Sequence, residues 1–137
     1  MSLVLFICKY NNGRSQIAEA LFNNLTKKHK AVSAAGNSVG EGIDAINIKL
    51  MKTKFGIDLS SQHPKLPTQS LLKSADKIII VCDPKDCILI PEDYIWKAEH
   101  WYIPELEGRS EEERLKIIED ISAKVKELIL RLDKKGQ

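Results

Sequence analysis

This chain has little that could restrain its fold covalently or anchor it in a membrane. Its 137 residues include only three cysteines, and aromatic residues make up 6% of the sequence. No apolar run is long enough to cross a bilayer or to form the core of a signal peptide, and no basic region precedes the first apolar run. We therefore expect a cytoplasmic protein, in which reactive or metal-bound cysteines are favoured over structural disulfides.

Positive charge is also too dispersed to indicate a large anionic partner. The formal net charge is only +2, and lysine and arginine are spread along the chain. This distribution leaves no basic patch of the kind that binds nucleic acid or a membrane surface. We expect a monomer that binds neither kind of partner.

Apolar runs alternate with helical periodicities along residues 1–137, which we interpret as one domain. Strands are predicted at residues 2–8, 31–35, 77–82 and 94–99. Helices are predicted at residues 14–28, 41–55 and 68–74, and from residue 110 to the C-terminus. The alternation predicts an α/β fold with three layers, α/β/α, around a four-stranded, mostly parallel sheet. Ligands of such sheets bind beyond the carboxyl ends of the strands.

The helix boundaries and the buried helix faces are also predicted. Thr68 is expected to cap the third helix, Ser110 and Glu113 form a capping box for the last, and Gly56 ends the second. The apolar stripes are Ile17, Leu21 and Leu25 in the first helix, Ile43, Ile46 and Leu50 in the second, and Ile118, Ile121, Val125, Leu128 and Leu132 in the last.

The first predicted strand runs into the first helix through a Cys-x5-Arg-Ser sequence, residues 8–15. A loop of this length can turn its backbone N–H groups inward around an oxyanion, and the positive end of the helix dipole points into the same cup. Arg14 adds a planar set of donors, and these positive groups favour the Cys8 thiolate over the thiol. The arrangement suits covalent attack by Cys8 on a phosphate-like group.

The loop as a whole is predicted to bind the substrate, through Lys9, Tyr10, Asn11, Asn12, Gly13, Arg14 and Ser15. Lys9 either strengthens the attraction for anions or points into solvent. Tyr10 and Trp101 are candidates for pocket walls, although a core position explains Trp101 equally well. The alternative for the loop is an inert, buried Cys8 and a surface Arg14.

The other two cysteines end and follow the strand predicted at residues 77–82. Since parallel strands end at one edge of a sheet, Cys8 and Cys82 are expected to share that edge. Cys82 and Cys87 are four residues apart in a loop with Asp83 and Pro84, so they can form a disulfide if the loop bends. Three thiols then suggest a relay by thiol–disulfide exchange. The alternatives are a core role for Cys82 beside an unrelated Cys87, or zinc held by both with a histidine.

Several segments resemble the arsenate reductases that share the low-molecular-weight tyrosine phosphatase fold. The similar segments are residues 11–22, 32–36, 56–59, 62–65, 76–79 and 100–104, together with the Cys82–Cys87 loop. The loop at residues 8–15 is common to reductases and phosphatases. The Gln-x-Pro-Lys sequence at residues 62–65 and the extra cysteine pair are typical of the reductases.

The resemblance implies a role for each matching residue. Cys8 is the nucleophile that attacks arsenate, Arg14 binds the oxyanion, Ser15 hydrogen-bonds the thiolate, and Asn11 shapes the loop. Cys82 and Cys87 are the relay cysteines, with thioredoxin or a similar dithiol as the final reductant. No cofactor is required, although Asn11, Glu19 and Ser33 match part of a monovalent-cation site found in some members.

The sequence departs from the family in the loop after Trp101. An Asp-Pro pair, whose aspartate is the general acid of the phosphatases, is replaced by Glu105-Leu106. The longer side chain displaces the acid by more than about 1 Å, and such a shift can cost about 100-fold in rate; Glu105 could equally be a solvated loop carboxylate. We therefore expect an arsenate reductase, with a low-molecular-weight protein tyrosine phosphatase and a non-catalytic anion-binding or redox-sensing module as alternatives.

Overall fold

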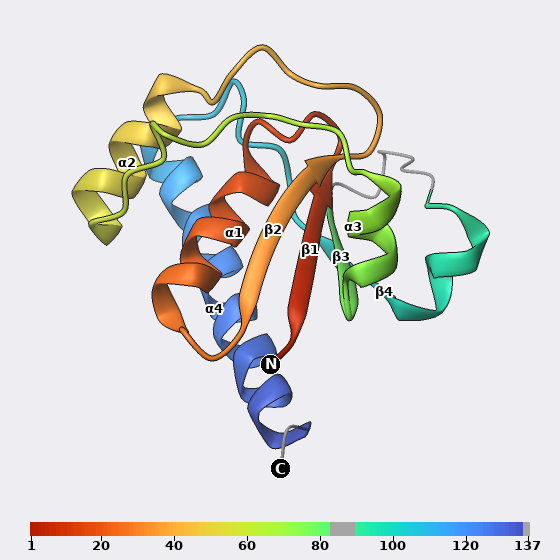
Figure 1. Ribbon diagram of the computed structural model, residues 1–137. Helices are drawn as coiled ribbons and strands as arrows, with labels where there is room; N and C mark the ends of the chain where they lie inside the picture. Colours follow the sequence, from red (N-terminus) through yellow and green to blue (C-terminus); the bar gives the residue numbers. More distant parts are fainter. Residues whose placement is uncertain (83–89, 136–137) are drawn as a thin grey trace.

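The computed structural model describes residues 1–82 and 90–135. Its centre is a sheet of four parallel strands in the order β2-β1-β3-β4 (Figure 1). The strands are β1 (Leu3–Cys8), β2 (Lys30–Ala35), β3 (Lys77–Cys82) and β4 (Ala98–Tyr102). The helices are α1 (Arg14–Leu25), α2 (Ala45–Phe55), α3 (Gln69–Ser74), the 3-10 helix η1 (Glu92–Lys97) and α4 (Glu111–Lys135). The predicted three-layer α/β/α architecture with a four-stranded parallel sheet is confirmed.

Alternating strand residues bury opposite faces of the sheet. Val4 and Phe6 of β1 belong to the larger apolar cluster, which α1, α2 and α4 cover. Leu5 and Ile7 belong to the smaller one, which α3 covers on the other face. Figure 1 shows this division, with α1, α2 and α4 on one side of the sheet and α3 on the other. Because both faces are buried, the central strands are apolar at nearly every position.

The predicted helix ends are confirmed where a local signal determines them. The hydroxyl of Thr68 accepts a hydrogen bond from the amide of Leu71 at 3.0 Å. Ser110 and Glu113 form the capping box, with the Glu113 amide 3.1 Å from the Ser110 hydroxyl. Gly56 ends α2 in the left-handed conformation (φ 69°), which glycine adopts without a steric penalty.

Other boundaries differ from the prediction. The second helix begins at Ala45 because Asp44 caps it, with its carboxylate accepting from the amide of Ile46 at 2.9 Å. The first helix ends at Leu25, three residues early. Leu25 and Ile46 are exposed, so their predicted places in the buried stripes are wrong. The buried stripe of α4 is confirmed in full.

The predicted fourth strand exists, but its predicted bounds, residues 94–99, are wrong. Residues 92–97 form η1, and β4 begins at Ala98, where pairing with Ile78 of β3 starts. The buried ammonium group of Lys97 donates to the carbonyls of Lys73 and Ala75, which anchors the end of η1 beside α3. This contact depends on residues more than twenty positions away, so no local pattern could indicate it.

The topology determines where a ligand can bind. β1 lies between β2 and β3. The chain therefore forms β2 on one side of β1 and later forms β3 on its other side. Such a reversal in strand order opens a crevice at the carboxyl ends of the two central strands. The loop after Cys8 lies at that crevice, at the edge of the sheet opposite the two chain termini in Figure 1. Among the described residues, no helix has the length and apolarity to span a membrane.

Glu99 of β4 links the sheet to α4 and Lys77. Its carboxylate accepts two hydrogen bonds from Arg131, at 3.1 and 2.9 Å, and one from the indole of Trp101 at 2.7 Å. It also forms an ion pair with Lys77 at 3.1 Å. Chiefly because of the Arg131 hydrogen bonds, the pKa of Glu99 falls from 4.5 to about 2. A lowered pKa means that the stabilisation is complete above pH 4.5 and is lost as pH falls toward 2.

We therefore expect Glu99→Gln to lower the free energy of unfolding near neutral pH and to have little effect in strong acid. The loss should be about 1–2 kcal/mol, less than the whole pKa shift would give, because water screens a partly exposed group. Urea unfolding of both proteins from neutral to acid pH measures it. Glu119→Gln, an exposed change on the same helix α4, is the control. A stability difference that stays constant as pH falls would contradict the assignment.

Candidate active site

The loop between β1 and α1 forms a cup, which is held by hydrogen bonds from the segment that follows β2. The carbonyls of residues 8–10 accept hydrogen bonds from the amides of Gly36, Asn37 and Gly40, at 2.7, 3.1 and 2.9 Å. Since the N–H of a trans peptide points away from its carbonyl, the N–H groups of residues 9–11 are turned away from that segment. The turn is completed by Asn11 in the left-handed conformation (φ 55°), which asparagine tolerates better than most residues.

Beneath the loop, buried amide side chains form a connected network. Asn11 donates to the hydroxyl of Ser15 at 2.8 Å and accepts from the amide of Lys65 at 3.0 Å. Gln16 donates to the backbone carbonyl and the side-chain oxygen of Asn11, both at 3.0 Å, and accepts from Gln62. Buried polar networks of this kind, once satisfied, hold a single conformation. The loop is therefore shaped before any ligand arrives.

Cys8 and Arg14 are presented by this framework. The sulfur of Cys8 is 2.9 Å from the Ser15 hydroxyl, so the hydroxyl can donate to a thiolate there. Arg14, the first residue of α1, is buried, and its guanidinium donates to the carbonyl of Ile103 at 2.8 Å. That bond joins the start of α1 to the segment after β4. The loop thus brings together the nucleophilic sulfur of Cys8, the Ser15 hydroxyl that can donate to it, and the Arg14 guanidinium.

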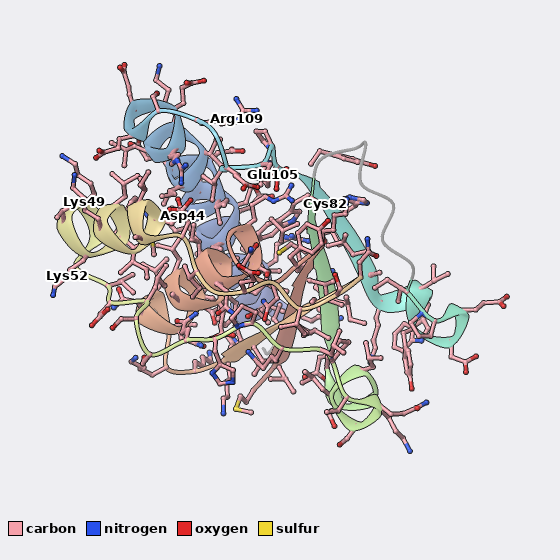
Figure 2. All side chains as sticks on the ribbon, turned by 90° about the horizontal axis from the view of Figure 1, so that it is seen from above. Asp44, Lys49, Lys52, Cys82, Glu105 and Arg109 are labelled. Atoms are coloured by element: carbon pink, nitrogen blue, oxygen red, sulfur yellow. The ribbon has the colours of Figure 1, made fainter. Side chains whose placement is uncertain are left out.

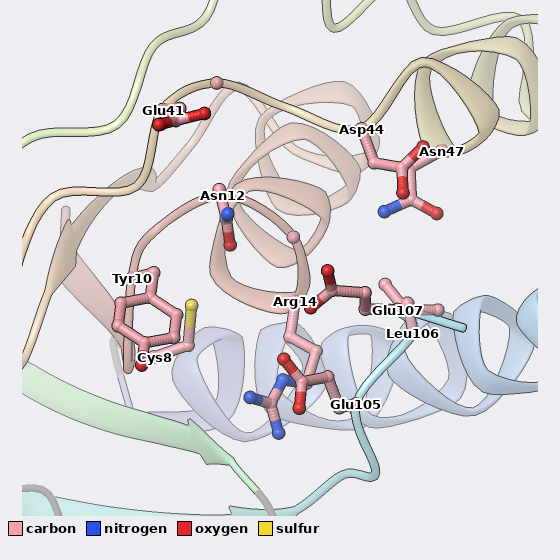
Figure 3. Close-up of a pocket in the computed structure, with 12 residues that line it drawn as sticks. Cys8, Tyr10, Asn12, Arg14, Glu41, Asp44, Asn47, Glu105, Leu106 and Glu107 are labelled. Atoms are coloured by element: carbon pink, nitrogen blue, oxygen red, sulfur yellow. The ribbon is translucent and has the colours of Figure 1, made fainter. Parts of the chain in front are cut away.

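A pocket of about 280 Å³ opens over this group. Figure 3 shows its lining, with the Cys8 sulfur and the Arg14 guanidinium on one side and residues of α2 on the other. The lining residues are Cys8, Tyr10, Asn12, Gly13, Arg14, Glu41, Gly42, Asp44, Asn47, Glu105, Leu106 and Glu107. The pocket has room for a tetrahedral oxyanion and for more than that, and its base is the loop predicted from the sequence.

The predicted loop residues divide into two groups. Tyr10, Asn12, Gly13 and Arg14 line the pocket, whereas Lys9, Asn11 and Ser15 are not among the described lining residues. Asn11 and Ser15 are fully buried and support the loop from below. The ammonium group of Lys9 lies 5.3 Å from the centre of the Tyr10 ring, a cation–π distance. Trp101 is a core residue, packed 5.7 Å from Phe6 between ring centres, and does not line the pocket.

Glu105 lies at the mouth of the pocket. It is exposed and follows the segment that Arg14 holds through Ile103. In Figure 3 its carboxylate lies beside the Arg14 guanidinium, on the side of the pocket facing the Cys8 sulfur. A carboxylic acid there can give a proton to a group leaving from a substrate bound at Cys8.

The opposite wall was not predicted from the sequence. It consists of Glu41, Asp44 and Asn47, from the start of α2 and the segment before it. Buried Arg114 of α4 holds two of these residues, donating to Asp44 and to Asn47 at 3.0 Å each. The pKa of Asp44 is lowered by the Ile46 amide and by Arg114, against the opposing effect of burial. No motif marks these residues, because they reach the pocket only through the packing of α2 on α4.

Cys82 ends β3, next to β1 and parallel to it, so the prediction that Cys8 and Cys82 share one edge of the sheet is confirmed. Figure 2 views the molecule from above that edge, with Cys82 at the end of β3. The side chain of Cys82 is fully buried in the apolar cluster under α3. Cys8 points to the same face of the sheet as Val4 and Phe6, which is the face opposite Cys82. Cys87 and the predicted loop lie outside the described residues.

The residues suggested for a monovalent cation already have partners. The hydroxyl of Ser33 donates to Glu19 at 2.8 Å, and the ammonium group of Lys65 lies 3.9 Å from the same carboxylate oxygen. The side-chain oxygen of Asn11 accepts from Gln16 and from the Lys65 amide. A further cation there would meet the charge of Lys65, so this arrangement does not fit one. Among residues 1–82 and 90–135, no group of three or more His, Cys, Asp or Glu side chains is placed to hold a metal ion.

Comparison with known proteins agrees with this geometry. Residues 3–137 match the family described as low molecular weight phosphotyrosine protein phosphatase. Arsenate reductase 2 of Staphylococcus saprophyticus is 29% identical over 126 residues, which cover 90% of this chain and 93% of that protein. The crystal structure of arsenate reductase from Archaeoglobus fulgidus is 31% identical with a TM-score of 0.80, covering 92% of this chain and 98% of that one. A thioredoxin-dependent arsenate reductase of Corynebacterium glutamicum is 28% identical with a TM-score of 0.74, covering 98% and 63%.

Proposed function

This chain belongs to the low molecular weight phosphotyrosine protein phosphatase family, and we propose that within the family it is an arsenate reductase. One observation carries the proposal: a Cys8 thiol in an oxyanion loop lies on the strand next to the one that ends in a second cysteine, Cys82. A phosphatase needs only the first thiol. A reductase needs a second thiol to take electrons from the first, and the similar proteins from S. saprophyticus and A. fulgidus are arsenate reductases.

In the first step, arsenate binds the loop at residues 8–15 and its charge is balanced by Arg14 and the backbone N–H groups. The Cys8 thiolate, which accepts a hydrogen bond from Ser15, attacks arsenic and forms a sulfur–arsenic bond. One arsenate hydroxyl group takes a proton, from Glu105 in this proposal, and leaves as water. The arsenic is still As(V) at this point.

In the second step, electrons move to arsenic. The Cys82 sulfur attacks the Cys8 sulfur, the sulfur–arsenic bond breaks, and its electron pair stays on arsenic, which leaves as arsenite, As(III). Cys87 then attacks Cys82 and releases Cys8 as the thiolate, so two thiols are oxidised to one disulfide for each arsenic reduced. Because Cys82 is buried on the other face of the sheet from Cys8, the attack requires the end of β3 to rearrange.

A dithiol must then reduce the Cys82–Cys87 disulfide. We propose thioredoxin or a similar protein, because the related C. glutamicum enzyme is thioredoxin-dependent. Such reductants act where thiols are kept reduced, so the proposal includes a cytoplasmic location. It also includes a monomer, since every group used in the two steps comes from one chain.

The test is arsenate turnover coupled to thioredoxin and its reductase, followed by mass spectrometry of the cysteine peptides. The wild-type protein should consume reductant only with arsenate and should accumulate a Cys82–Cys87 disulfide when reductant is withheld. Cys87→Ser should complete one turnover and stop with Cys8 joined to Cys82. Full steady-state activity in Cys87→Ser would disprove the relay.

A tyrosine phosphatase is the second candidate, favoured by the position of Glu105 beside Arg14. In that case Glu105→Gln should lower aryl phosphate hydrolysis by about 100-fold or more through loss of the general acid, whereas Cys82→Ser should leave it unchanged. Both variants are assayed with an aryl phosphate and with arsenate. Fast aryl phosphate turnover without arsenate-dependent consumption of reductant would favour the phosphatase.

A further inference from the structure

A histidine touches the second cysteine of the relay. The Nε2 atom of His100 lies 3.0 Å from the Cys82 sulfur, well within the distance of a hydrogen bond to sulfur. The two residues are diagonal neighbours on adjacent parallel strands, because His100 pairs with Ile80 and Cys82 pairs with Tyr102. The thiol is completely buried, whereas the histidine is exposed. The imidazole therefore connects a buried sulfur to solvent.

The ring of His100 is held in this orientation by its own strand. It stacks on the Tyr102 ring, with 4.3 Å between the centres and 16° between the planes. The neighbouring Glu99 points to the other face of the sheet, where it binds Arg131, Trp101 and Lys77. On the face of His100, the described titratable groups include Cys82 of β3, Tyr102 of β4, and Tyr94 and Lys97 of η1. The Tyr94 ring packs on the same apolar cluster, and the Lys97 ammonium group lies 5.1 Å from its centre.

Partial burial lowers the pKa of His100 below its ordinary value of 6.5. The neutral imidazole thus predominates near neutral pH, with one nitrogen able to accept a proton. A thiol beside it is a natural donor, and the thiolate is the form of cysteine that attacks sulfur.

We propose that His100 is a catalytic base of the relay and takes the proton of Cys82 as this thiol becomes the attacking thiolate. The inference rests on the proposed function, because only the relay uses Cys82 as a nucleophile. The S–H bond of Cys82 breaks toward Nε2, the sulfur keeps the electron pair, and that pair forms the bond to the Cys8 sulfur. The imidazolium passes its proton to water at the exposed side of the ring, and no further reactant is needed.

This assignment explains how Cys82, which is buried away from Cys8, can still become a thiolate. A buried thiol without a base would ionise only at high pH, because burial disfavours the charged form. With His100 in contact, the proton is removed where the sulfur rests, before the sulfur travels to Cys8. A glutamine would not replace His100 in this role, because its amide can hydrogen-bond the sulfur but cannot take the proton.

The test isolates the attack of Cys82 from arsenate chemistry. In a Cys87→Ser background, Cys8 is loaded through the pocket that it lines with 5-thio-2-nitrobenzoate as a mixed disulfide, and mass spectrometry confirms that Cys8 carries it. Attack by Cys82 on the Cys8 sulfur then releases the coloured thiolate in a first-order reaction. The release rate is measured across pH, with His100 intact, with His100→Gln, and with His63→Gln as an exposed histidine control.

We expect His100→Gln to slow the release by about 100-fold near pH 7, the lower end of what a general base typically contributes. The deficit should narrow as pH rises, because a growing fraction of the thiol then ionises without help. His63→Gln should match the parent. Equal rates, or a deficit that is the same at every pH, would overturn the proposal, since a purely structural role gives no pH dependence.

The same reaction separates this inference from the proposed function. If the parent reduces no arsenate but His100→Gln still shows the pH-dependent deficit, the base assignment stands and the arsenate proposal fails. If arsenate is reduced and the deficit is absent, the relay stands and His100 is not its base. Aryl phosphate hydrolysis, which needs Cys8 but not Cys82, should be equal in the His100→Gln and parent proteins and serves as a check of folding.

Discussion

Replacing Cys8 with serine should reduce both arsenate reduction and aryl phosphate hydrolysis by about 10⁴-fold or more, because the nucleophile of both reactions is lost. The alcohol of serine ionises far above neutral pH and is a poor nucleophile without an adjacent base. The hydroxyl of Ser15, 2.9 Å away, donates to an anion and does not take a proton from a neutral alcohol. The other groups of the loop remain in place and can still bind the oxyanion.

Steady-state assays with arsenate and with an aryl phosphate measure the loss, and calorimetric titration with inorganic phosphate measures binding. Phosphate should bind Cys8→Ser at least as well as it binds the parent, since one negative group is removed from the pocket. Because serine is close to cysteine in size, the midpoint of thermal unfolding should change little. Residual arsenate turnover within tenfold of wild type would show that another thiol starts the reaction.

The second large effect is expected for Arg14→Lys, which retains the charge but loses the planar donors. Arg14 is buried and donates to Ile103 at 2.8 Å, so its guanidinium both faces the pocket and holds the segment leading to Glu105. A lysine ammonium cannot bind the oxyanion in two places while keeping the Ile103 bond. Removing such a preorganised donor set typically costs about 10²- to 10³-fold in rate.

The measurement is kcat/KM for arsenate together with inhibition by inorganic phosphate. We expect kcat to fall as well as KM to rise, because the charge on the oxyanion changes during attack and the guanidinium is arranged for that change. Arg131→Lys is the matched control, since Arg131 lies on α4 and binds Glu99 away from the pocket. If Arg14→Lys lost only affinity for phosphate, with kcat intact, Arg14 would be a binding residue without a role in the chemical step.

Local patterns predicted most of the elements of this fold. The strands at β1, β2 and β3 are short apolar runs, and the caps at Thr68 and Ser110 are signals within three residues of the helix ends they determine. The errors have two sources, a helix start that the local Asp44 cap shifts and a contact between residues distant in the sequence. Ile46 is exposed because Asp44 caps α2 and turns Asn47 and Leu50 inward, and η1 ends where Lys97 reaches α3.

The order of residues alone determined the chemistry at Cys8. A thiol, five intervening residues and a guanidinium must lie together when a strand meets a helix over a loop this short, so the cup is a local consequence of the sequence. The parallel alternation of strands and helices likewise placed Cys8 and Cys82 at one edge.

Only the tertiary structure decided which face of the sheet each thiol occupies and what touches it. Successive strand residues point to opposite faces, so a shift of one residue in the pairing of β1 with β3 would reverse the relation between Cys8 and Cys82. The contact of Cys82 with His100 and the wall formed by Asp44 and Asn47 depend on the same long-range packing. No spacing along the chain encodes these contacts, because they arise only when distant elements are pressed against one sheet.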